Sequence, residues 1–376
     1  MEHHIAFFGH DAADGAVRRR VRAMQNDGLQ VTGFMMRRRE NISPEWNNID
    51  LGLTRDRAVL ARLKSIFVGA RVAARSDELE HADVIYARNL DMLIAAFLAK
   101  RLRNLPTPVI YECLDINRLM IRQDIVGKIL RWIEGRLLKR SKALVTSSPG
   151  FLKHYFEVHH AGKYTAYLVE NRLAAGFNYG ARPSAPKQGR PDKLRLGWVG
   201  MLRCQRSLDL MCDLADRFPE QLEIRLHGIP GRTEIAEFEP VIEPRANIIF
   251  AGRYKSPEDL AEIYANIDVV WAGDFMDAGY NSVWLLPNRI YEGGYYGVPA
   301  IAPKETETGN WIADRSLGFT LAEPLEDTLP SLITEFLGSR ASITAANRHS
   351  LAQTTDTFVE PPGLIKSIIL AALGRD

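Results

Sequence analysis

Short apolar segments alternate with helix-like segments along most of the chain. Residues 4–9 (HIAFFG) are a short apolar run that ends in glycine. Residues 82–89 (ADVIYARN) and 107–115 (TPVIYECLD) are apolar runs followed by polar residues, and residues 142–148 and 166–172 repeat this pattern. Nearly continuous apolar strands separated by helices are typical of a parallel sheet that is covered on both faces. The sequence therefore predicts a doubly wound α/β fold, in which ligands gather at the carboxyl ends of the strands.

The alternation restarts after a stretch rich in Gly and Pro. A chain of 376 residues is too long for one ordinary α/β domain and suits two domains of ~150–190 residues each. We therefore predict a Rossmann-like domain over residues 1–175, a linker over 176–193 and a second Rossmann-like domain over 194–350. Residues 351–376 include a Pro-initiated amphipathic helix with no strand to follow it, and we expect this segment to pack back on the first domain.

Two helices are expected to follow strands of the second domain, over residues 207–217 and 256–266. Ser256 is the expected N-cap of the second of these helices, because Pro257 then falls in the first turn, where its missing N–H costs nothing.

The charges are distributed unevenly along the chain. Residues 1–185 carry 29 Lys and Arg against 19 Asp and Glu, whereas residues 186–376 carry 19 against 27. A basic half is compatible with anionic lipid, nucleic acid or a phosphorylated ligand. No nucleic-acid-binding motif is present, so nucleic acid is not an expected partner.

The expected location of the protein is the cytoplasm. The three cysteines lack the spacing of a disulfide framework or a zinc site. The N-terminus lacks the order of a signal peptide, and no apolar run reaches ~18 residues.

The motifs of the second half resemble those of GT-B glycosyltransferases, especially the large retaining group called family 4. Residues 196–211 are similar to that family's strand, glycine turn and basic loop, residues 247–271 to the elements that lead to its sugar site, and residues 285–302 to its nucleotide-binding stretch. In the first half, residues 83–89, 109–115, 143–151 and 169–172 resemble the bacterial members that assemble exopolysaccharides. The resemblance runs from about residue 5 to about residue 302.

The resemblance implies a fold and an activity. The expected fold is GT-B, with two Rossmann-like domains that face a central cleft. The first domain would bind the acceptor and the second the donor. The expected reaction moves a hexose-type sugar from a nucleoside-diphosphate sugar to a hydroxyl of a glycan acceptor, which we expect to be lipid-linked, in bacterial exopolysaccharide or cell-surface polysaccharide synthesis.

The donor diphosphate is expected to meet two arginines. Arg203 and Arg206 follow a strand and a glycine turn, so two guanidiniums could contact adjacent phosphate oxygens, and the following helix N-terminus would add N–H groups. The alternative is that both arginines are solvated surface charges. Glu292 could accept both ribose hydroxyls, or it could instead serve as a cap or ion-pair partner. The full set of expected nucleotide-sugar contacts is Gly200, Arg203, Arg206, Gly252, Asn288, Arg289, Glu292 and Gly293.

One position departs from the family pattern. The family usually carries a second acid eight positions before the helix glutamate, and here that position is Trp284. The usual hexose contact is therefore missing. Asp274, Asp277 or Asn281 on the preceding loop could replace it, and the stereochemical outcome of the transfer is left open.

Catalytic and acceptor-binding residues are expected at strand ends of the first domain. Asp115 is the first candidate for a group that removes the acceptor proton, followed by Glu112, His10 and Asp11. Arg88 and Asn89 could position acceptor hydroxyls. For each of these residues, a loop, capping or ion-pair role is the alternative.

Residues 116–140 place apolar side chains and Trp132 among seven cations at roughly helical spacing. Such a helix can lie on anionic lipid, and with the arginine triplets at 18–20 and 37–39 it predicts peripheral contact with the inner face of the plasma membrane. The alternative is that the apolar stripe is core and the cations form a solvated face.

No tightly bound cofactor is expected, and the donor is expected to be a UDP-sugar in preference to a GDP-sugar. Metal independence is predicted, because no Asp-x-Asp occurs in the chain and arginines can neutralise the diphosphate. The alternatives are a GT-B-fold sugar-nucleotide epimerase and a catalytically inactive sugar-binding subunit. An NAD-dependent oxidoreductase is disfavoured, because GHDAADG after the first strand lacks the Gly-x-Gly-x-x-Gly turn.

Overall fold

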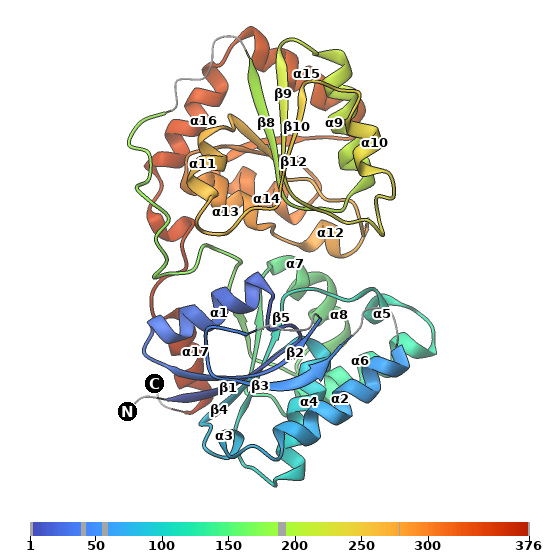
Figure 1. The fold of residues 1–376 in the computed structure, drawn as a ribbon, viewed down its shortest axis with the longest axis vertical. Coiled ribbons are helices and arrows are strands. Elements are labelled where there is room, and N and C mark those ends of the chain that lie inside the picture. The colour runs from blue at the N-terminus through green and yellow to red at the C-terminus, as the bar shows by residue number, and fades with distance from the viewer. Residues whose placement is uncertain (1–2, 39–42, 55–58, 187–192, 278, 375–376) are drawn as a thin grey trace. The chain divides into compact units, whose positions relative to one another are not determined.

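The computed structural model describes residues 3–38, 43–54, 59–186, 193–277 and 279–374. The chain forms two compact units (Figure 1). Unit 1 comprises Met1–Glu170, Ala174–Gly176 and Pro361–Asp376, and unit 2 comprises Asn171–Leu173 and Phe177–Glu360.

Unit 1 is built on a seven-stranded parallel sheet in the order β3-β2-β1-β4-β5-β6-β7. The central strands are buried throughout, as expected for apolar runs covered on both faces. Their bounds are β1 (His4–Gly9), β2 (Gln30–Arg37), β3 (Asn48–Leu53), β4 (Val84–Arg88), β5 (Val109–Cys113), β6 (Ala143–Thr146) and β7 (Ala166–Leu168). Strand order reverses direction between β1 and β4, which makes this place the switch point of the sheet.

The helices of unit 1 cover both faces of this sheet. Helices α1 (Gly15–Asn26) and α17 (Leu364–Ala372) pack together on one face, where Ile365 and Ile369 join the core around Val17 and Val21. The other face carries α2 (Val59–Ala73), α4 (Asn89–Leu102) and α6 (Ile125–Leu138) (Figure 1). The remaining helices are short: α3 (Asp77–Glu80), α5 (Arg118–Ile121), α7 (Pro149–Phe151), the π-helical turn Leu152–Phe156 and α8 (Glu157–His160).

Unit 2 repeats the architecture with a six-stranded parallel sheet in the order β10-β9-β8-β11-β12-β13. Its switch point lies between β8 and β11. The strands are β8 (Leu194–Leu202), β9 (Leu222–Pro230), β10 (Ile248–Gly252), β11 (Val269–Trp271), β12 (Ala300–Pro303) and β13 (Gly318–Leu321). The two parallel α/β sheets confirm the predicted doubly wound fold.

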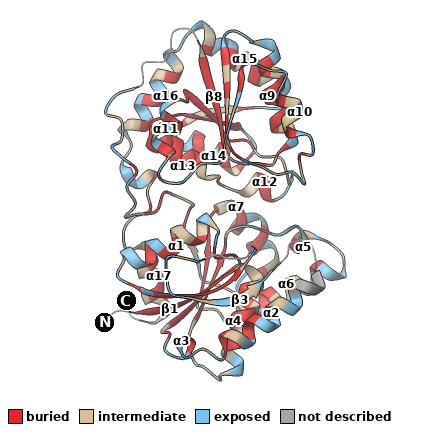
Figure 2. Ribbon diagram, viewed as in Figure 1, coloured by how far each residue is buried: buried red, intermediate tan, exposed pale blue. Residues whose placement is uncertain are grey.

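The helices of unit 2 enclose two apolar clusters, one on each side of the sheet. Helix α13, in the middle of the second cluster, is buried over nearly its whole length (Figure 2). The helices are α9 (Gln205–Arg217), α10 (Phe238–Ile242), α11 (Leu260–Ala265), α12 (Asn281–Trp284), α13 (Asn288–Tyr295), α14 (Glu307–Arg315), α15 (Leu325–Gly338) and α16 (Ala341–Ala352), with a 3-10 turn at Thr355–Thr357.

One predicted helix start is wrong. The helix expected from residue 256 begins only at Leu260, and Ser256 does not cap it. Residues 256–259 form a turn instead, in which the Asp259 carboxylate accepts a hydrogen bond from the Lys255 backbone N–H at 2.7 Å. The sequence pattern assigned the capping role to Ser256. In the structure, Asp259 instead makes the hydrogen bond that shapes the turn.

Much of the predicted linker is docked on unit 2. Arg182 donates to the backbone carbonyls of Tyr295, Ser350 and Gln353 at 2.8–3.0 Å. Tyr179 is buried, and its carbonyl accepts from the Tyr296 hydroxyl at 2.8 Å. The high glycine and proline content here therefore marks a segment that is irregular but packed. Residues 187–192 of the predicted linker lie outside the described residues.

Candidate functional site

Two charged side chains meet at the switch point of unit 2. Arg203 follows β8, Asp274 follows β11, and the Arg203 Nη2 atom lies 3.4 Å from Asp274 Oδ2. Both side chains are partly exposed. Because the carboxyl ends of neighbouring strands diverge at such a point, ligands of open α/β sheets bind there. Arg203 was predicted to contact the diphosphate and Asp274 the sugar. The two side chains therefore lie next to each other at the switch point of unit 2.

Arg289 lies buried beneath this place. It projects from α13 and donates hydrogen bonds to the carbonyls of Val199, Ala272 and Gly273 at 3.1–3.3 Å. Burial lowers the pKa of its guanidinium from the ordinary value, and within the described residues its Nε atom has no hydrogen-bond partner. Arg289 thus clamps the ends of β8 and β11 together and keeps a positive charge under the site.

Near this clamp, the backbone conformation favours glycine at position 200. Gly200 has a φ of +118°, which favours glycine, and a Cβ placed on it would lie 3.7 Å from Arg289 Nη1. Gly252 also has a positive φ, of +74°, and faces open space. Gly293 differs, because a Cβ there would come within 3.3 Å of Val298 and the Tyr264 ring. Packing of α13 therefore explains a glycine at position 293, and its expected role in ligand approach stays a prediction.

Glu292 also projects from α13, and it is only 3% exposed. Its carboxylate accepts a hydrogen bond from the Tyr264 hydroxyl of α11 at 3.0 Å. Tyr264 in turn stacks on Tyr296 at a centroid distance of 5.7 Å. The carboxylate is therefore held in one orientation. Asn288 is the first residue of α13, where it is partly exposed.

Arg206 does not join Arg203 as predicted. It donates to Glu323 and Glu326 through four hydrogen bonds of 2.7–3.1 Å, and its guanidinium lies 4.8 Å from the centre of the Phe275 ring. The hydrogen bonds to the two carboxylates raise the pKa of Arg206 well above its ordinary value. In this structure the guanidinium of Arg206 is hydrogen-bonded to protein carboxylates, so an arginine at this position is explained without a bound phosphate.

The loop after β11 holds Asp274 in place. Asp274 Oδ1 accepts from the Ser282 hydroxyl and from the Met276 backbone N–H, each at 3.0 Å. Asn281 is 3% exposed at the start of α12. Trp284 ends α12 and lies edge-on to Tyr280 with centroids 6.1 Å apart. Of the three suggested replacements for the missing acid, Asp274 is the one that lies at the switch point beside Arg203.

In unit 1, His10 and Asp11 follow β1 directly at its switch point. The His10 Nε2 atom lies 3.4 Å from Asp14 Oδ2, and His10 Nδ1 has no hydrogen-bond partner within the described residues. Burial is the largest single influence on Asp14 and opposes its charge. The hydrogen bond and charge of His10, the charge of Arg88 and the hydrogen bond from the Val17 backbone N–H together outweigh it and hold the pKa of Asp14 well below its usual range. Asp11 is 8% exposed and accepts from the Ala13 backbone N–H at 3.1 Å.

Glu112 does not fit its predicted catalytic role. It is fully buried, and its carboxylate accepts from Arg88 Nε at 2.5 Å, Arg20 Nε at 2.9 Å and the Tyr86 hydroxyl at 2.8 Å. Burial alone would raise the pKa of Glu112, but the two arginines lower it below the ordinary value. A carboxylate with three donors and no exposed surface is a structural anion. The same ion pair argues against the acceptor-binding role expected of Arg88. This side chain is 1% exposed and lies over the Phe7 ring.

Asn89 and Asp115 lie at the ends of the next two strands. Asn89 begins α4 with a φ of +68°, an uncommon conformation for a residue other than glycine, and its Oδ1 atom has no hydrogen-bond partner within the described residues. Such strained positions cluster at functional sites. Asp115 is exposed in the bend after β5.

Three residues of these sites were missed in the sequence. Asp14 beside His10, Tyr264 beside Glu292 and Ser282 beside Asp274 all orient predicted residues. Only Asp14 left a signal, because it lies four residues after His10 at the N-cap of a helix. Tyr264 meets Glu292 through the packing of α11 on α13, and Ser282 meets Asp274 through the irregular path of one loop, so neither contact follows a regular spacing in the sequence. Within the described residues, no group of three or more His, Cys, Asp or Glu side chains could hold a metal ion.

Comparison with known proteins adds to this picture. No protein-family model matches the chain. It is 38% identical over 328 residues, 84% of this chain and 80% of the relative, to the succinoglycan biosynthesis protein ExoL of Rhizobium meliloti strain 1021.

Several solved structures share the fold over nearly their whole length. Sucrose-phosphate synthase from Thermosynechococcus elongatus has a TM-score of 0.73 at 15% identity, with 98% of each chain covered. HepE of Anabaena in complex with UDP has a TM-score of 0.68 at 15% identity, with all of both chains covered. WaaG, a glycosyltransferase involved in lipopolysaccharide biosynthesis, has a TM-score of 0.65 at 14% identity, with 98% of this chain and all of WaaG covered.

The fold places the chain in the GT-B class, and it shares this fold with solved glycosyltransferases such as WaaG. Within that class, the chain belongs to the family of the succinoglycan biosynthesis protein ExoL. The predicted fold class and the predicted resemblance to exopolysaccharide enzymes are thereby confirmed.

Proposed function

We propose that the protein transfers a hexose-type sugar from a nucleoside-diphosphate sugar to a hydroxyl of a glycan acceptor. The observation that carries the proposal is the set of charges at the unit 2 switch point: Arg203 and Asp274 above, buried Arg289 below, and the oriented carboxylate of Glu292 on α13. Two cations suit a diphosphate, and a fixed carboxylate suits ribose hydroxyls. UDP is the favoured nucleotide, in line with the UDP and UDP-glucose complexes of HepE.

The reaction breaks the bond between the anomeric carbon and the diphosphate oxygen. Negative charge then develops on the leaving diphosphate, where Arg203 and the charge of Arg289 stabilise it. Asp274, which Ser282 and a backbone N–H hold in place, is proposed to contact the sugar where the family acid is replaced by Trp284.

The acceptor hydroxyl forms the new bond to the anomeric carbon and loses its proton. For an inverting displacement, we propose His10 as the group that takes this proton, because Asp14 orients the imidazole and can stabilise the imidazolium. Asp115, exposed at the end of β5, is the second candidate. Asn89 is proposed to bind acceptor hydroxyls through its unpartnered amide oxygen.

Isothermal calorimetry with UDP, GDP, ADP and TDP tests the donor site. Binding of one nucleotide by the wild type, weakened in both Glu292→Ala and Arg203→Ala, supports the assignment. Absence of binding for all four nucleotides contradicts it. Turnover of a bound sugar nucleotide without any acceptor, giving a new sugar nucleotide, would indicate an epimerase instead.

We also propose that the acceptor is lipid-linked and that the protein works at the inner face of the plasma membrane. The support is helix α6, on which Ile125, Ile129 and Trp132 are exposed. Three exposed cations follow them at the end of the helix and just past it, Arg136, Lys139 and Arg140. No helix among the described residues is long and apolar enough to cross a membrane. Transfer to a lipid-linked glycan in vesicles should exceed transfer to the same glycan free in solution. Equal rates on both acceptors would contradict this proposal.

A further inference from the structure

Cys204 lies between the two loops that carry the charges of the candidate donor site. It directly follows Arg203 in the loop after β8, and it is 2% exposed. Its Sγ atom accepts a hydrogen bond at 3.2 Å from the backbone N–H of Phe275 in the loop after β11. Phe275 directly follows Asp274. Each of the two charged residues is therefore one position away from a shared contact.

The same sulfur atom also caps a helix. Cys204 is the N-cap of α9, where its Sγ accepts from the backbone N–H of Ser207 at 3.3 Å. Serine, threonine, asparagine and aspartate are the preferred N-caps, and a thiol sulfur is a weak acceptor. A cap alone therefore does not explain a cysteine at this position. The larger sulfur atom reaches N–H groups of two separate segments at distances longer than the usual N–H···O distance of about 2.9 Å.

Ser207 makes a second link between the same two loops. Its side chain is fully buried, donates to the carbonyl of Gly273 at 3.4 Å and accepts from the indole N–H of Trp271 at 3.0 Å. The Gly273 carbonyl also accepts from Arg289 at 3.1 Å. The start of α9 is thus tied to the end of β11 and to the buried cation beneath the site.

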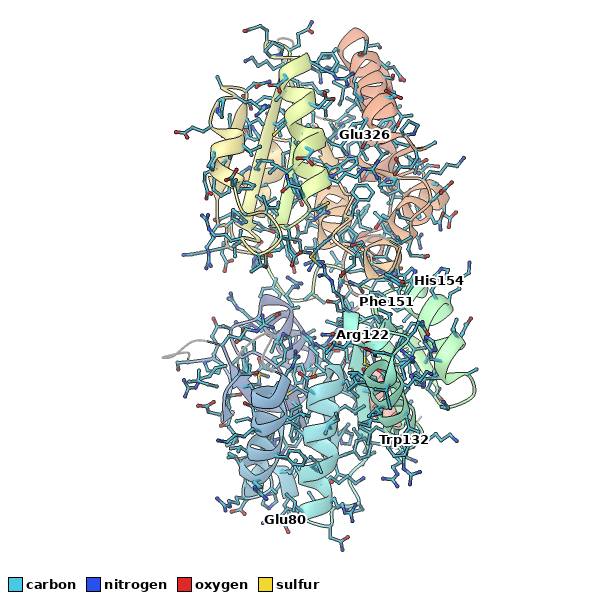
Figure 3. The ribbon with its side chains drawn as sticks, turned by 90° about the vertical axis from the view of Figure 1, so that its right-hand side faces the viewer. Glu80, Arg122, Trp132, Phe151, His154 and Glu326 are labelled. Atoms are coloured by element: carbon cyan, nitrogen blue, oxygen red, sulfur yellow. The ribbon has the colours of Figure 1, made fainter. Side chains whose placement is uncertain are left out.

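Arg206 holds the side chain of the residue whose backbone Cys204 holds. Its guanidinium lies 4.8 Å from the centre of the Phe275 ring. The carboxylates of Glu323 and Glu326 keep it there through four hydrogen bonds, and Figure 3 labels Glu326. Phe275 is therefore fixed at two points by residues of the loop after β8 and the start of α9.

The other two cysteines do not make such a link. Cys212 lies on the same helix as the cap and packs in an apolar cluster of unit 2, where it is 6% exposed. The Cys113 thiol donates to the carbonyl of Asp115, two residues away in the same segment. In the described part of the chain, Cys204 is the cysteine whose sulfur accepts from two separate segments.

We propose that Cys204 is a positioning residue for transfer, because its sulfur sets the separation of Arg203 and Asp274. The Nη2 atom of Arg203 lies 3.4 Å from Oδ2 of Asp274. Loss of the sulfur leaves the N–H of Phe275 without its acceptor, and an N–H group in this position takes another partner or water. We expect the loop after β11 then to move away from Arg203. The role in transfer rests on the proposed function, whereas the link between the loops does not.

Calorimetry with UDP and with uridine tests the role of the sulfur. Cys204→Ala should weaken UDP binding about fivefold, the cost of a displaced hydrogen bond. Uridine affinity should not change, because Arg203 is assigned to the phosphates. Cys204→Ser keeps an acceptor at the same position and should restore UDP binding to the wild-type value. Equal losses in the alanine and serine variants would overturn the inference.

Cys212→Ala is the matched control, because it removes a second buried thiol from α9. It should lower the stability of the protein, as large-to-small core substitutions do, but leave UDP affinity unchanged. Cys204→Ala should also have almost no effect on UDP affinity once Arg203→Ala is present, since a residue that acts through Arg203 is then silent. Full additivity of these two substitutions contradicts the inference, and so does a comparable loss of UDP affinity in Cys212→Ala.

Amide hydrogen exchange of the full chain without nucleotide separates this inference from the proposed function. The Phe275 N–H should exchange at least about tenfold faster in Cys204→Ala than in the wild type, because the loop opens more readily. Cys204→Ser should keep the slow exchange. Unchanged exchange in Cys204→Ala overturns the link between the loops. Absence of UDP binding by the wild type would instead contradict the proposed donor site, and with it the role of Cys204 in transfer.

Discussion

The Arg88 guanidinium lies 2.5 Å from the carboxylate of Glu112, and both side chains are enclosed within unit 1. The two residues are direct neighbours across β4 and β5. Arg20 from α1 and the Tyr86 hydroxyl complete the hydrogen bonding of the carboxylate. This cluster ties α1 to β4, which borders the switch point, and to the neighbouring β5, so it positions the candidate acceptor site without taking part in its chemistry.

Removal of the buried carboxylate should be costly for stability. Glu112→Ala leaves two arginines without their shared anion, and breaking a buried ion pair in this way costs about 3–5 kcal/mol. The free energy of unfolding from urea denaturation measures this loss. Asp115→Asn, an exposed change three residues away, is the control and should alter stability by less than about 0.5 kcal/mol. Equal stability of both variants would contradict the structural role.

The stability should also depend on pH through Glu112. Its pKa is lowered from the ordinary 4.5 in the folded protein, so the unfolded chain takes up a proton first as the pH falls. The contribution of Glu112 is thus complete well above pH 4.5 and is lost as pH falls through the folded pKa. Urea denaturation of the wild type and of Glu112→Gln across pH 3–7 measures this, and the slope below ~pH 5 should be smaller in the variant.

Much of the fold could be predicted from the sequence, because buried parallel strands are local apolar runs. The candidate site was only partly predictable. Residue types after predicted strands pointed to His10, Arg203 and Asp274, and the structure places these residues after β1, β8 and β11, while their roles stay predictions. The pairing of Arg206 with Glu323 could not be foreseen, since the two residues lie 117 positions apart. The burial of Glu112 could not be predicted from the sequence, because the last residues of a strand can face either a ligand or the core.

The two arginines of the basic loop should contribute unequally to diphosphate binding. Arg203 lies at the switch point, whereas Arg206 is held by two carboxylates. We expect Arg203→Ala to weaken UDP binding at least tenfold, as for a lost charge-assisted hydrogen bond, and Arg206→Ala by less than about threefold. Calorimetry with uridine provides the control, because neither substitution should change its affinity. A larger effect of Arg206→Ala would favour the original pairing of both arginines on phosphate.

Glu292 should recognise the ribose rather than the phosphates. Glu292→Gln is expected to weaken UDP binding about tenfold, the cost of hydrogen bonds to a charged group, but to leave the affinity for 2′,3′-dideoxy-UDP almost unchanged. Tyr264→Phe removes the hydroxyl that orients the carboxylate and should give a smaller loss with the same ligand dependence. An equal loss for both ligands would mean that Glu292 acts through the packing of α13.

His10 and Asp14 should act together in transfer. His10→Gln is expected to lower kcat by about 10²–10⁴-fold, the usual contribution of a general base, with the affinity for UDP unchanged. Asp14→Asn is the sharper test. In the wild type, the Asp14 carboxylate accepts hydrogen bonds from the backbone N–H groups of Ala16 and Val17 and so caps α1. Asparagine can still cap the helix, but it lacks the negative charge beside the imidazole of His10.

If Asp14 only caps the helix, Asp14→Asn should keep kcat near the wild-type value. If it orients His10 for proton transfer, kcat should fall at least tenfold while KM for the acceptor changes little. Asp115→Asn completes the comparison, since a loss of kcat larger than that of His10→Gln would move the base to the end of β5. In that outcome, the contact between His10 and Asp14 would only stabilise the loop after β1.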